Sequence, residues 1–319
     1  MKKIILFSLL LITIILTSCV KPDVFEPKVS DFSLSERAVF ICQFGFPGPL
    51  PGMLTSPFGV TVDNEGNIYV ADTGGDRIQK FNSRGEFILG FGSTGNLNGQ
   101  MNLPYSIKID KNNSLWVVDT GNARIQRFDS NGKFLMKFGE PGTANGQFNS
   151  CMDLAVHGRN IFVLDVGNSR VQVFDFHGKF LYKWGQSGPD PKDFQAPFGI
   201  TVDHLGYVYI SDLSGQIKKY TSKGKFIKAW GTVGTEDGQF QSPSRVAADP
   251  FGYIYVADTA NLRIQKFNSD GEFIMKFGKN DGGSYTFMAP YGIYADNQNK
   301  VYVTDVGYCN VKVFQMKLK

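Results

Sequence analysis

Charged side chains that could do chemistry recur along this chain at a fixed spacing. Six aspartates stand 46 or 47 residues apart, and four of them are followed five residues later by an arginine, as Asp72 is by Arg77. A carboxylate and a guanidinium at this spacing could act on a substrate, or they could form an ion pair that braces a loop. The fourfold recurrence fits structural ion pairs better than four active sites. Gln216 and Asn310 replace the arginine in the other two copies, and we expect looser loops there.

The aspartates mark a repeat of four short strand-like segments. In the first unit these segments are rich in β-branched and aromatic residues, and turns that contain Gly separate them: residues 59–63, 67–72, 77–81 and 86–91. Four antiparallel strands at this period form one blade of a β-propeller, and the blades must pack around an axis to bury their faces. The predicted fold class is therefore all-β, a six-bladed β-propeller of four-stranded antiparallel blades.

The two ends of the repeat array predict how the ring closes. The sixth copy stops after its third strand, at residues 311–314, and lacks a fourth. The segment AVFICQF, residues 38–44, reads like a fourth strand but precedes the first copy. We therefore expect the N-terminal strand 38–44 to complete the last blade, which would cover an otherwise exposed sheet edge. The propeller is assigned to residues 38–314, with a C-terminal tail at 315–319.

The repeated motif resembles the NHL repeat. The resemblance rests on Pro-x-Gly-apolar, then Gly-x-apolar-aromatic-Val-x-Asp, then Asn-x-Arg-apolar-Gln, and finally Gly-x-Phe with Phe-Gly, and it covers residues 38–314. The Asn-His-Leu triplet itself is replaced by GNA at 121–123, GNS at 167–169 and ANL at 260–262. The family includes binding platforms, sensor domains and a few enzymes, so the resemblance implies a fold rather than one activity.

The innermost strand of each unit begins at the central mouth, at the end of the ring that we name the top. In four of the six units an aromatic residue follows the first residue of this strand. Concave aromatic surfaces with a few polar groups are common ligand sites. The residues that we assign to such a site are Phe58, Tyr105, Met152, Asp153, Phe198, Arg245, Tyr291 and, one step lower in the channel, Lys108. Two alternatives stay open: the aromatics could fill the core, and Asp153 could pair with Arg245.

The histidines do not form a metal-binding pattern. His157 and His204 fall in turns after the innermost strand, and His177 falls in a turn before the outermost strand. All three are expected at the bottom rim, whereas a zinc centre needs converging ligands. The sequence also lacks a nucleophile elbow, a zinc-type cysteine pair and a phosphate-binding loop. No cofactor is predicted, and a calcium or zinc ion in the channel remains the open alternative.

The cysteines suggest a lock on the closure. Cys42 lies on the closing strand, and Cys309 lies at the start of the third strand of the same blade. In an oxidising compartment these neighbours could form a disulfide. Cys151 replaces a proline in the third unit and is expected to be a small buried residue.

The N-terminus has the pattern of an export signal. A basic start is followed by an apolar run and by Leu-Thr-Ser-Cys at residues 16–19. This ending resembles the bacterial lipobox, in which the cysteine is acylated. We expect a lipoprotein signal peptide at residues 1–18, with lipid on Cys19 and a flexible tether at 19–37. The protein would be exported and lipid-anchored to the bacterial membrane. Val20 favours the outer membrane of a Gram-negative cell, by resemblance to the sorting rule.

Charge and composition narrow the class of partner. The chain has 33 Lys and Arg against 29 Asp and Glu, and removal of Lys2 and Lys3 with the signal would leave a net charge near +2. No basic run is present, so we predict no nucleic-acid partner. The sequence favours a cell-envelope lipoprotein that binds a protein, peptide or glycan at its top mouth. The alternatives are a metal-dependent lyase or hydrolase acting in the channel, and a structural or assembly component that uses its blade surfaces.

Overall fold

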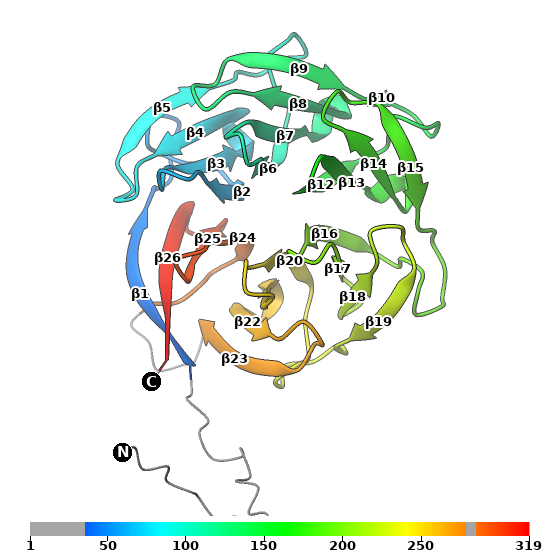
Figure 1. The fold of residues 1–319 in the computed structure, drawn as a ribbon. Helices are drawn as coiled ribbons and strands as arrows, with labels where there is room; N and C mark the ends of the chain where they lie inside the picture. The colour runs from blue at the N-terminus through cyan, green and yellow to red at the C-terminus, as the bar shows by residue number, and fades with distance from the viewer. Residues whose placement is uncertain (1–35, 279–284, 319) are drawn as a thin grey trace, which may run out of the picture. The chain divides into compact units, whose positions relative to one another are not determined.

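The computed structural model describes residues 36–278 and 285–318, and six four-stranded antiparallel sheets surround a central axis (Figure 1). The predicted six-bladed propeller is confirmed. In the first three blades the strands, from the axis outward, are β2 (Pro57–Val62), β3 (Ile68–Asp72), β4 (Arg77–Phe81), β5 (Phe87–Phe91); β6 (Pro104–Ile109), β7 (Leu115–Asp119), β8 (Arg124–Phe128), β9 (Phe134–Phe138); β12 (Cys151–His157), β13 (Asn160–Asp165), β14 (Arg170–Asp175), β15 (Phe180–Trp184).

The other three blades follow the same order. Their strands are β16 (Pro197–Val202), β17 (Val208–Asp212), β18 (Gln216–Tyr220), β19 (Phe226–Trp230); β20 (Pro243–Ala248), β21 (Ile254–Asp258), β22 (Arg263–Phe267), β23 (Phe273–Gly278); β24 (Pro290–Ala295), β25 (Lys300–Asp305), β26 (Asn310–Leu318) and β1 (Glu36–Phe44). The remaining elements are a short parallel pair and four 3-10 turns: β10 (Glu140–Pro141), β11 (Gln147–Phe148), η1 (Thr73–Gly75), η2 (Thr120–Asn122), η3 (Val166–Asn168) and η4 (Thr259–Asn261). In the part of the chain described, no helix is long and apolar enough to span a membrane.

The hydrophobic core lies between the blades rather than within them. One cluster joins Tyr69 and Ile78 of the first blade to Val117 and Phe128 of the second, and all four are almost completely buried. Five further clusters fill the other blade interfaces, including the one between the sixth blade and the first. Each sheet is therefore covered on both faces by its neighbours, and the ring is stable only as a whole.

The sixth blade is completed by the N-terminal strand, as expected. β1 pairs antiparallel with β26, and the two lie side by side in Figure 1 (blue and red). Phe44, at the end of β1, is 8% exposed and its ring centroid lies 4.8 Å from that of Phe81 in the first blade. Two boundaries differ from the prediction. β1 begins at Glu36, and residues 315–318 continue β26 instead of forming a tail, because Glu36 pairs with Leu318.

The possible Cys42–Cys309 disulfide is not formed. Both cysteines are free thiols, and a register shift between Phe40 and Cys42 places Cys42 opposite Val313. Cys309 precedes β26 and lies four residues from that pairing position. Neighbouring strands alone do not bring two thiols within bonding distance. Cys151 is completely buried, as expected.

The repeated aspartates are loop braces. Each of four carries an arginine ion pair at 2.7–2.8 Å: Asp72–Arg77, Asp119–Arg124, Asp165–Arg170 and Asp258–Arg263. The same carboxylates also accept backbone N–H groups from the loop that enters the blade, as Asp119 does from Asn102 at 2.7 Å. One aspartate thus ties two top loops together.

In the two blades without the arginine, a lysine supplies the cation instead. The expectation of looser loops there considered only the arginine position. Lys218 lies 3.2 Å from Asp212, and Lys312 lies 2.6 Å from Asp305. Both lysines stand where the other blades have a glutamine, two residues after the arginine position. All four side chains are at most 3% exposed. A buried aspartate without a nearby cation would destabilise the folded state. Here the lysine supplies the positive charge from a position two residues further along the strand.

Removal of the closing strand should destabilise the whole ring. We expect deletion of residues 36–45 to lower the melting temperature by more than ~10 °C, because a shift of 2–4 °C accompanies each ~1 kcal/mol in a domain of this size. Differential scanning calorimetry measures the change. Ile41→Ala is the matched control, because this side chain of β1 is 50% exposed and its truncation should leave the melt unchanged. A deletion variant that melts with the wild type would contradict the closure.

Candidate functional site

A β-bulge at the top of each innermost strand sets the residues at the mouth. The pairing of β2 with β3 passes from Pro57 opposite Asp72 to Gly59 opposite Ala71, so Phe58 is the extra residue. The register shifts at the same point in the other five innermost strands. A bulge re-aims a side chain out of the regular pleat. The second residue of each innermost strand therefore occupies an equivalent place around the mouth.

Five of these residues form a surface that we name the aromatic floor: Phe58, Tyr105, Met152, Phe198 and Tyr291. The ring centroid of Phe58 lies 4.6 Å from that of Tyr105 and 4.4 Å from that of Tyr291, and Phe198 lies 5.5 Å from Tyr291. All five side chains are partly exposed. The floor is therefore neither a buried part of the core nor a set of isolated surface residues, and the sequence-predicted aromatics are brought together.

The two tyrosines of the floor carry free polar groups. Neither the Tyr105 nor the Tyr291 hydroxyl makes a hydrogen bond to another described residue. Burial raises the pKa of Tyr291 to about 12, with Arg245 acting against this shift and Tyr105 adding to it. The Tyr291 phenol is thus protonated at neutral pH, so it can donate a hydrogen bond but cannot serve as a base.

Beneath the floor, Arg245 and Asp153 form a pair that we name the central plug. The guanidinium lies 2.9 Å from the Asp153 carboxylate, and both residues are at most 3% exposed. Arg245 also donates to backbone carbonyl oxygens of floor residues in three other blades: Phe198 at 3.0 Å, Met152 at 2.8 Å and Tyr105 at 3.3 Å. One side chain from the fifth blade thus bridges the channel to the second, third and fourth.

The Asp153 carboxylate is also fully occupied. It accepts hydrogen bonds from the Ser106 hydroxyl at 2.5 Å and from the backbone N–H groups of Leu154 and Ile200 at 2.9 Å each, besides the one from Arg245. A carboxylate offers about four acceptor positions, so none remains for a ligand. Of the two roles considered from sequence, mutual pairing is the one that the structure shows. Ser106 was not predicted to be a partner of Asp153. The signal in the sequence was a polar residue at a position where other blades have glycine.

Glycine at the level of the plug reflects close packing of the innermost strands. A Cβ atom on Gly59 would lie 2.9 Å from the Ile107 nitrogen, and one on Gly199 would lie 2.7 Å from the Ser244 oxygen. The backbones of neighbouring blades therefore meet directly here. Side chains from the other blades, including the plug, fill the remaining space.

Lys108 lies below the plug, in the lower channel. Its side chain lines an open-ended cavity of about 150 Å³ to which the innermost strands of all six blades contribute. Burial lowers the pKa of Lys108, the Asp153 charge opposes this effect, and the Arg245 charge adds to it. The structure therefore separates Lys108 from the aromatic floor, so the residues predicted as one site lie in two separate places.

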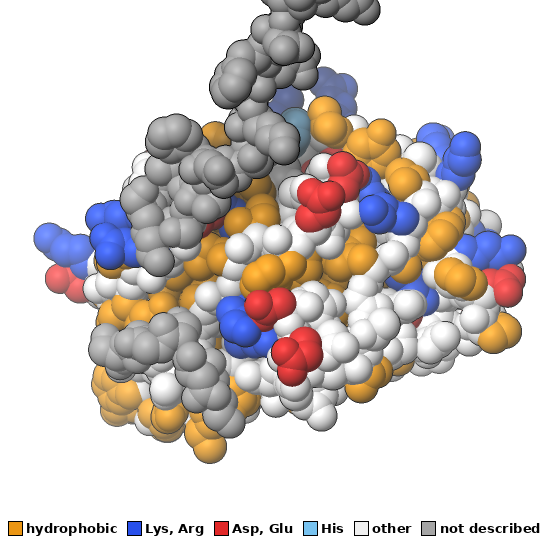
Figure 2. Space-filling view, turned by 90° about the horizontal axis from the view of Figure 1, so that it is seen from below, with side chains coloured by type: hydrophobic (Ala, Val, Ile, Leu, Met, Phe, Trp, Pro, Cys, Tyr) orange, Lys and Arg blue, Asp and Glu red, His pale blue; other side chains and the backbone are white. Residues whose placement is uncertain are grey.

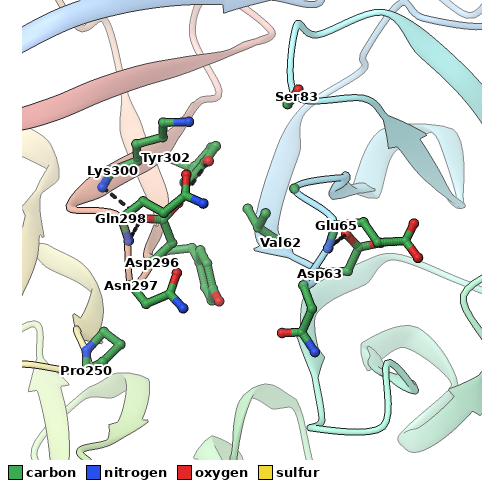
Figure 3. Close-up of a pocket in the computed structure, with 13 residues that line it drawn as sticks. Val62, Asp63, Glu65, Ser83, Pro250, Asp296, Asn297, Gln298, Lys300 and Tyr302 are labelled. Atoms are coloured by element: carbon green, nitrogen blue, oxygen red, sulfur yellow. Dashed lines mark hydrogen bonds between the residues drawn. The ribbon is translucent and has the colours of Figure 1, made fainter.

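A larger cleft of about 660 Å³ opens at the bottom, where the sixth blade meets the first. Figure 3 shows Asp296, Gln298 and Lys300 on one side of it and Asp63 and Glu65 on the other. The two aspartates are already used by their own turns. Asp63 accepts from two turn N–H groups at 2.8–3.0 Å, and Asp296 does so at 2.8 Å. The cleft was not predicted from the sequence, because it forms only where the first and last blades meet in space.

The histidines stand apart from the mouth. His157 ends β12, and His177 and His204 lie in exposed turns. Within residues 36–278 and 285–318, no three His, Cys, Asp or Glu side chains are grouped so that they could hold a metal ion.

The plug should behave as one energetic unit. Arg245→Met leaves Asp153 buried without its cation, and we expect a loss of ~3–5 kcal/mol in the free energy of unfolding. The double variant with Asp153→Asn removes both charges, so its loss should be smaller than the sum of the two single losses. Urea denaturation of the four proteins measures this coupling. Strictly additive losses would show that the pair does not interact.

Comparison with known proteins supports the repeat and the fold. Residues 54–81 and 240–267 match the family model described as NHL repeat. A segment of 61 residues is 39% identical to the B-box type zinc finger protein ncl-1 of Caenorhabditis elegans. That match covers 19% of this chain and 7% of the relative, so the chain spans only a small part of that protein's length.

Solved propellers resemble the chain over most of its length at low identity. A protein of unknown function from Bacteroides thetaiotaomicron has a TM-score of 0.68 at 15% identity, covering 89% of this chain and 76% of its own. A streptogramin B lyase has a TM-score of 0.60 at 13% identity, covering 89% and 99%, and a gluconolactonase from Xanthomonas campestris has 0.61 at 16%, covering 88% and 98%. At these identities the likeness shows the fold alone. The chain is thus a six-bladed β-propeller in which two segments match the NHL repeat.

Proposed function

We propose that this protein is a binding protein of the bacterial cell envelope that holds a peptide, a glycan or a protein partner on its aromatic floor. The observation that carries the proposal is the contact of four partly exposed aromatic rings at the mouth, three of them joined by centroid distances of 4.4–4.6 Å. Aromatic side chains supply a large rigid contact area at little cost in conformational entropy. The free hydroxyls of Tyr105 and Tyr291 add polar groups that can orient a ligand.

The plug supports binding rather than catalysis at the mouth. Asp153 and Arg245 would be the natural acid, base or oxyanion-stabilising groups there, but each is buried and hydrogen-bonded to the protein. A catalytic group must reach the reacting atom within hydrogen-bond distance. The lyase and lactonase neighbours support only a shared fold, and their activities do not transfer at 13–16% identity.

The blade sides offer a weaker case for an assembly role. In each of the first five blades, the second residue of the outermost strand is aliphatic and at least 36% exposed. These residues are Ile88, Leu135, Leu181, Ile227 and Ile274. Figure 2 shows one side of the propeller, where hydrophobic side chains are interspersed with Lys, Arg, Asp and Glu. The exposed aliphatics are distributed one to a blade, so they do not gather into a single apolar patch of the kind that marks a protein interface.

The floor can be tested by removing its rings one at a time. A glycan array and an immobilised peptide library supply candidate ligands for the mature chain. We expect Tyr105→Ala and Phe198→Ala to weaken the binding of any selective ligand by about tenfold or more each, as central aromatic contacts do. Phe251→Ala is the control, because this aromatic residue in a bottom turn is 55% exposed. Affinity that is indifferent to both floor variants, with unchanged melting temperatures, would contradict the proposal.

The envelope location rests on Cys19, which lies outside the described residues. We expect Cys19→Ser to move the protein from the membrane fraction to the soluble fraction of an expressing bacterium, and to abolish labelling by a clickable palmitate analogue. Cys151→Ser is the matched control, because that thiol is buried in the propeller. Equal membrane recovery of wild type and Cys19→Ser would exclude the lipid anchor.

A further inference from the structure

The cavity of the lower channel combines apolar walls with one cation. It is lined by the innermost strands of all six blades, and most of its lining is alanine, valine and isoleucine. The polar side chains in the lining are Thr61, Lys108, Thr201 and Tyr294. The cavity measures about 150 Å³, and a single water molecule needs only ~10–15 Å³ of such space. It therefore has room for a ligand of several non-hydrogen atoms.

Lys108 has no counter-ion within the described residues. Its ammonium makes no hydrogen bond or ion pair there, and the charged groups that influence it are Asp153 and Arg245 of the plug. Asp153 is already neutralised by Arg245 at 2.9 Å and by three further hydrogen bonds. The lower channel thus carries one positive charge that has no counter-ion among the described residues. Such a charge is costly unless a partner supplies the opposite sign.

Thr61 provides a second, independent sign of a missing partner. Its side chain is 0% exposed and lines the same cavity, yet its hydroxyl has no hydrogen-bond partner among the described residues. The equivalent Thr201 hydroxyl accepts from the Ala248 N–H at 3.3 Å. A buried hydroxyl without a partner has lost its hydrogen bonds to water and gained none in return, which is unfavourable. An unused donor and an unpaired cation therefore share one small space.

We propose that the lower channel binds a small carboxylate, whose oxygens accept hydrogen bonds from the Lys108 ammonium and the Thr61 hydroxyl. A charge of −1 matches the single lysine, whereas a phosphate would bring more negative charge than the site balances. The short apolar part of the ligand would pack against Ala155, Ala247 and Ile293. This site is distinct from the aromatic floor, because the central plug lies between them.

The carboxylate has two conceivable sources. It belongs either to a free short-chain acid or to the end of a longer chain. Tyr294 lines both the lower channel and the bottom cleft of about 660 Å³, so a chain lying in the cleft could place its terminal carboxylate beside Lys108. Asn64, Asn297 and Gln298 line the cleft and offer polar contacts to such a chain.

Titration of the mature protein with propionate tests the site, with propylammonium as the probe of the same size and opposite charge. Calorimetry and the shift of the ¹³C-carboxyl resonance report binding. We expect saturable binding with a dissociation constant on the order of 1 mM, and none for propylammonium. Lys108→Met should weaken propionate binding at least tenfold, and the isosteric Thr61→Val about threefold or more. Lys111→Met is the matched control, because this lysine is exposed in the turn after β6.

The outcomes distinguish a free acid from the end of a longer chain, and the carboxylate site from the aromatic floor. Trialanine that binds more tightly than propionate would assign the site to a chain end, and propionate that binds while trialanine does not would assign it to a free acid. Tyr105→Ala should leave propionate binding unchanged, so a failure at the mouth does not affect this test. The absence of saturable binding, or equal affinity in the wild type, Lys108→Met and Thr61→Val, would overturn the carboxylate site.

Discussion

The pairing of β1 with β26 is the constraint on which the rest of the propeller depends. Every hydrophobic cluster of the described chain lies between two blades, so each blade relies on both neighbours. At the interface between the sixth blade and the first, the start of the chain completes the sixth sheet and adds Phe44, which packs near Phe81. Nonlocal pairing of this kind costs loop-closure entropy, which the burial of the whole ring offsets.

Closure also determines what the centre of the ring can do. Once the six innermost strands are held together, their backbones approach so closely that glycine is required at Gly59 and Gly199. Arg245 then bridges the axis and pairs with Asp153. The channel is thereby divided into an aromatic surface above and a small cavity around Lys108 below. One ion pair thus separates the two surfaces that we propose as ligand sites.

Much of this arrangement can be predicted from the sequence, because the number of repeats gives the number of blades and the strand order gives the residues that reach the mouth. The missing fourth strand of the last copy predicts the closure for the same reason. Compensation between positions is harder to foresee. Lys218 and Lys312 replace an arginine that is lost two residues away, which only the three-dimensional neighbourhood of the aspartate makes plain. The bulge in β1 likewise sets Cys42 opposite Val313 instead of Lys312, and sequence alone does not reveal a one-residue shift in register.

We infer that the central plug separates an upper aromatic site from a lower cationic one. A crystallographic fragment screen of the mature protein, with neutral ring compounds and small carboxylates soaked separately, tests it most directly. The account predicts ring compounds on the floor beside Tyr105 and Tyr291, carboxylates beside Lys108, and an unchanged contact between Arg245 and Asp153 in every structure. Fragments that displace Arg245 and pass through the axis, or that avoid both sites, would contradict it.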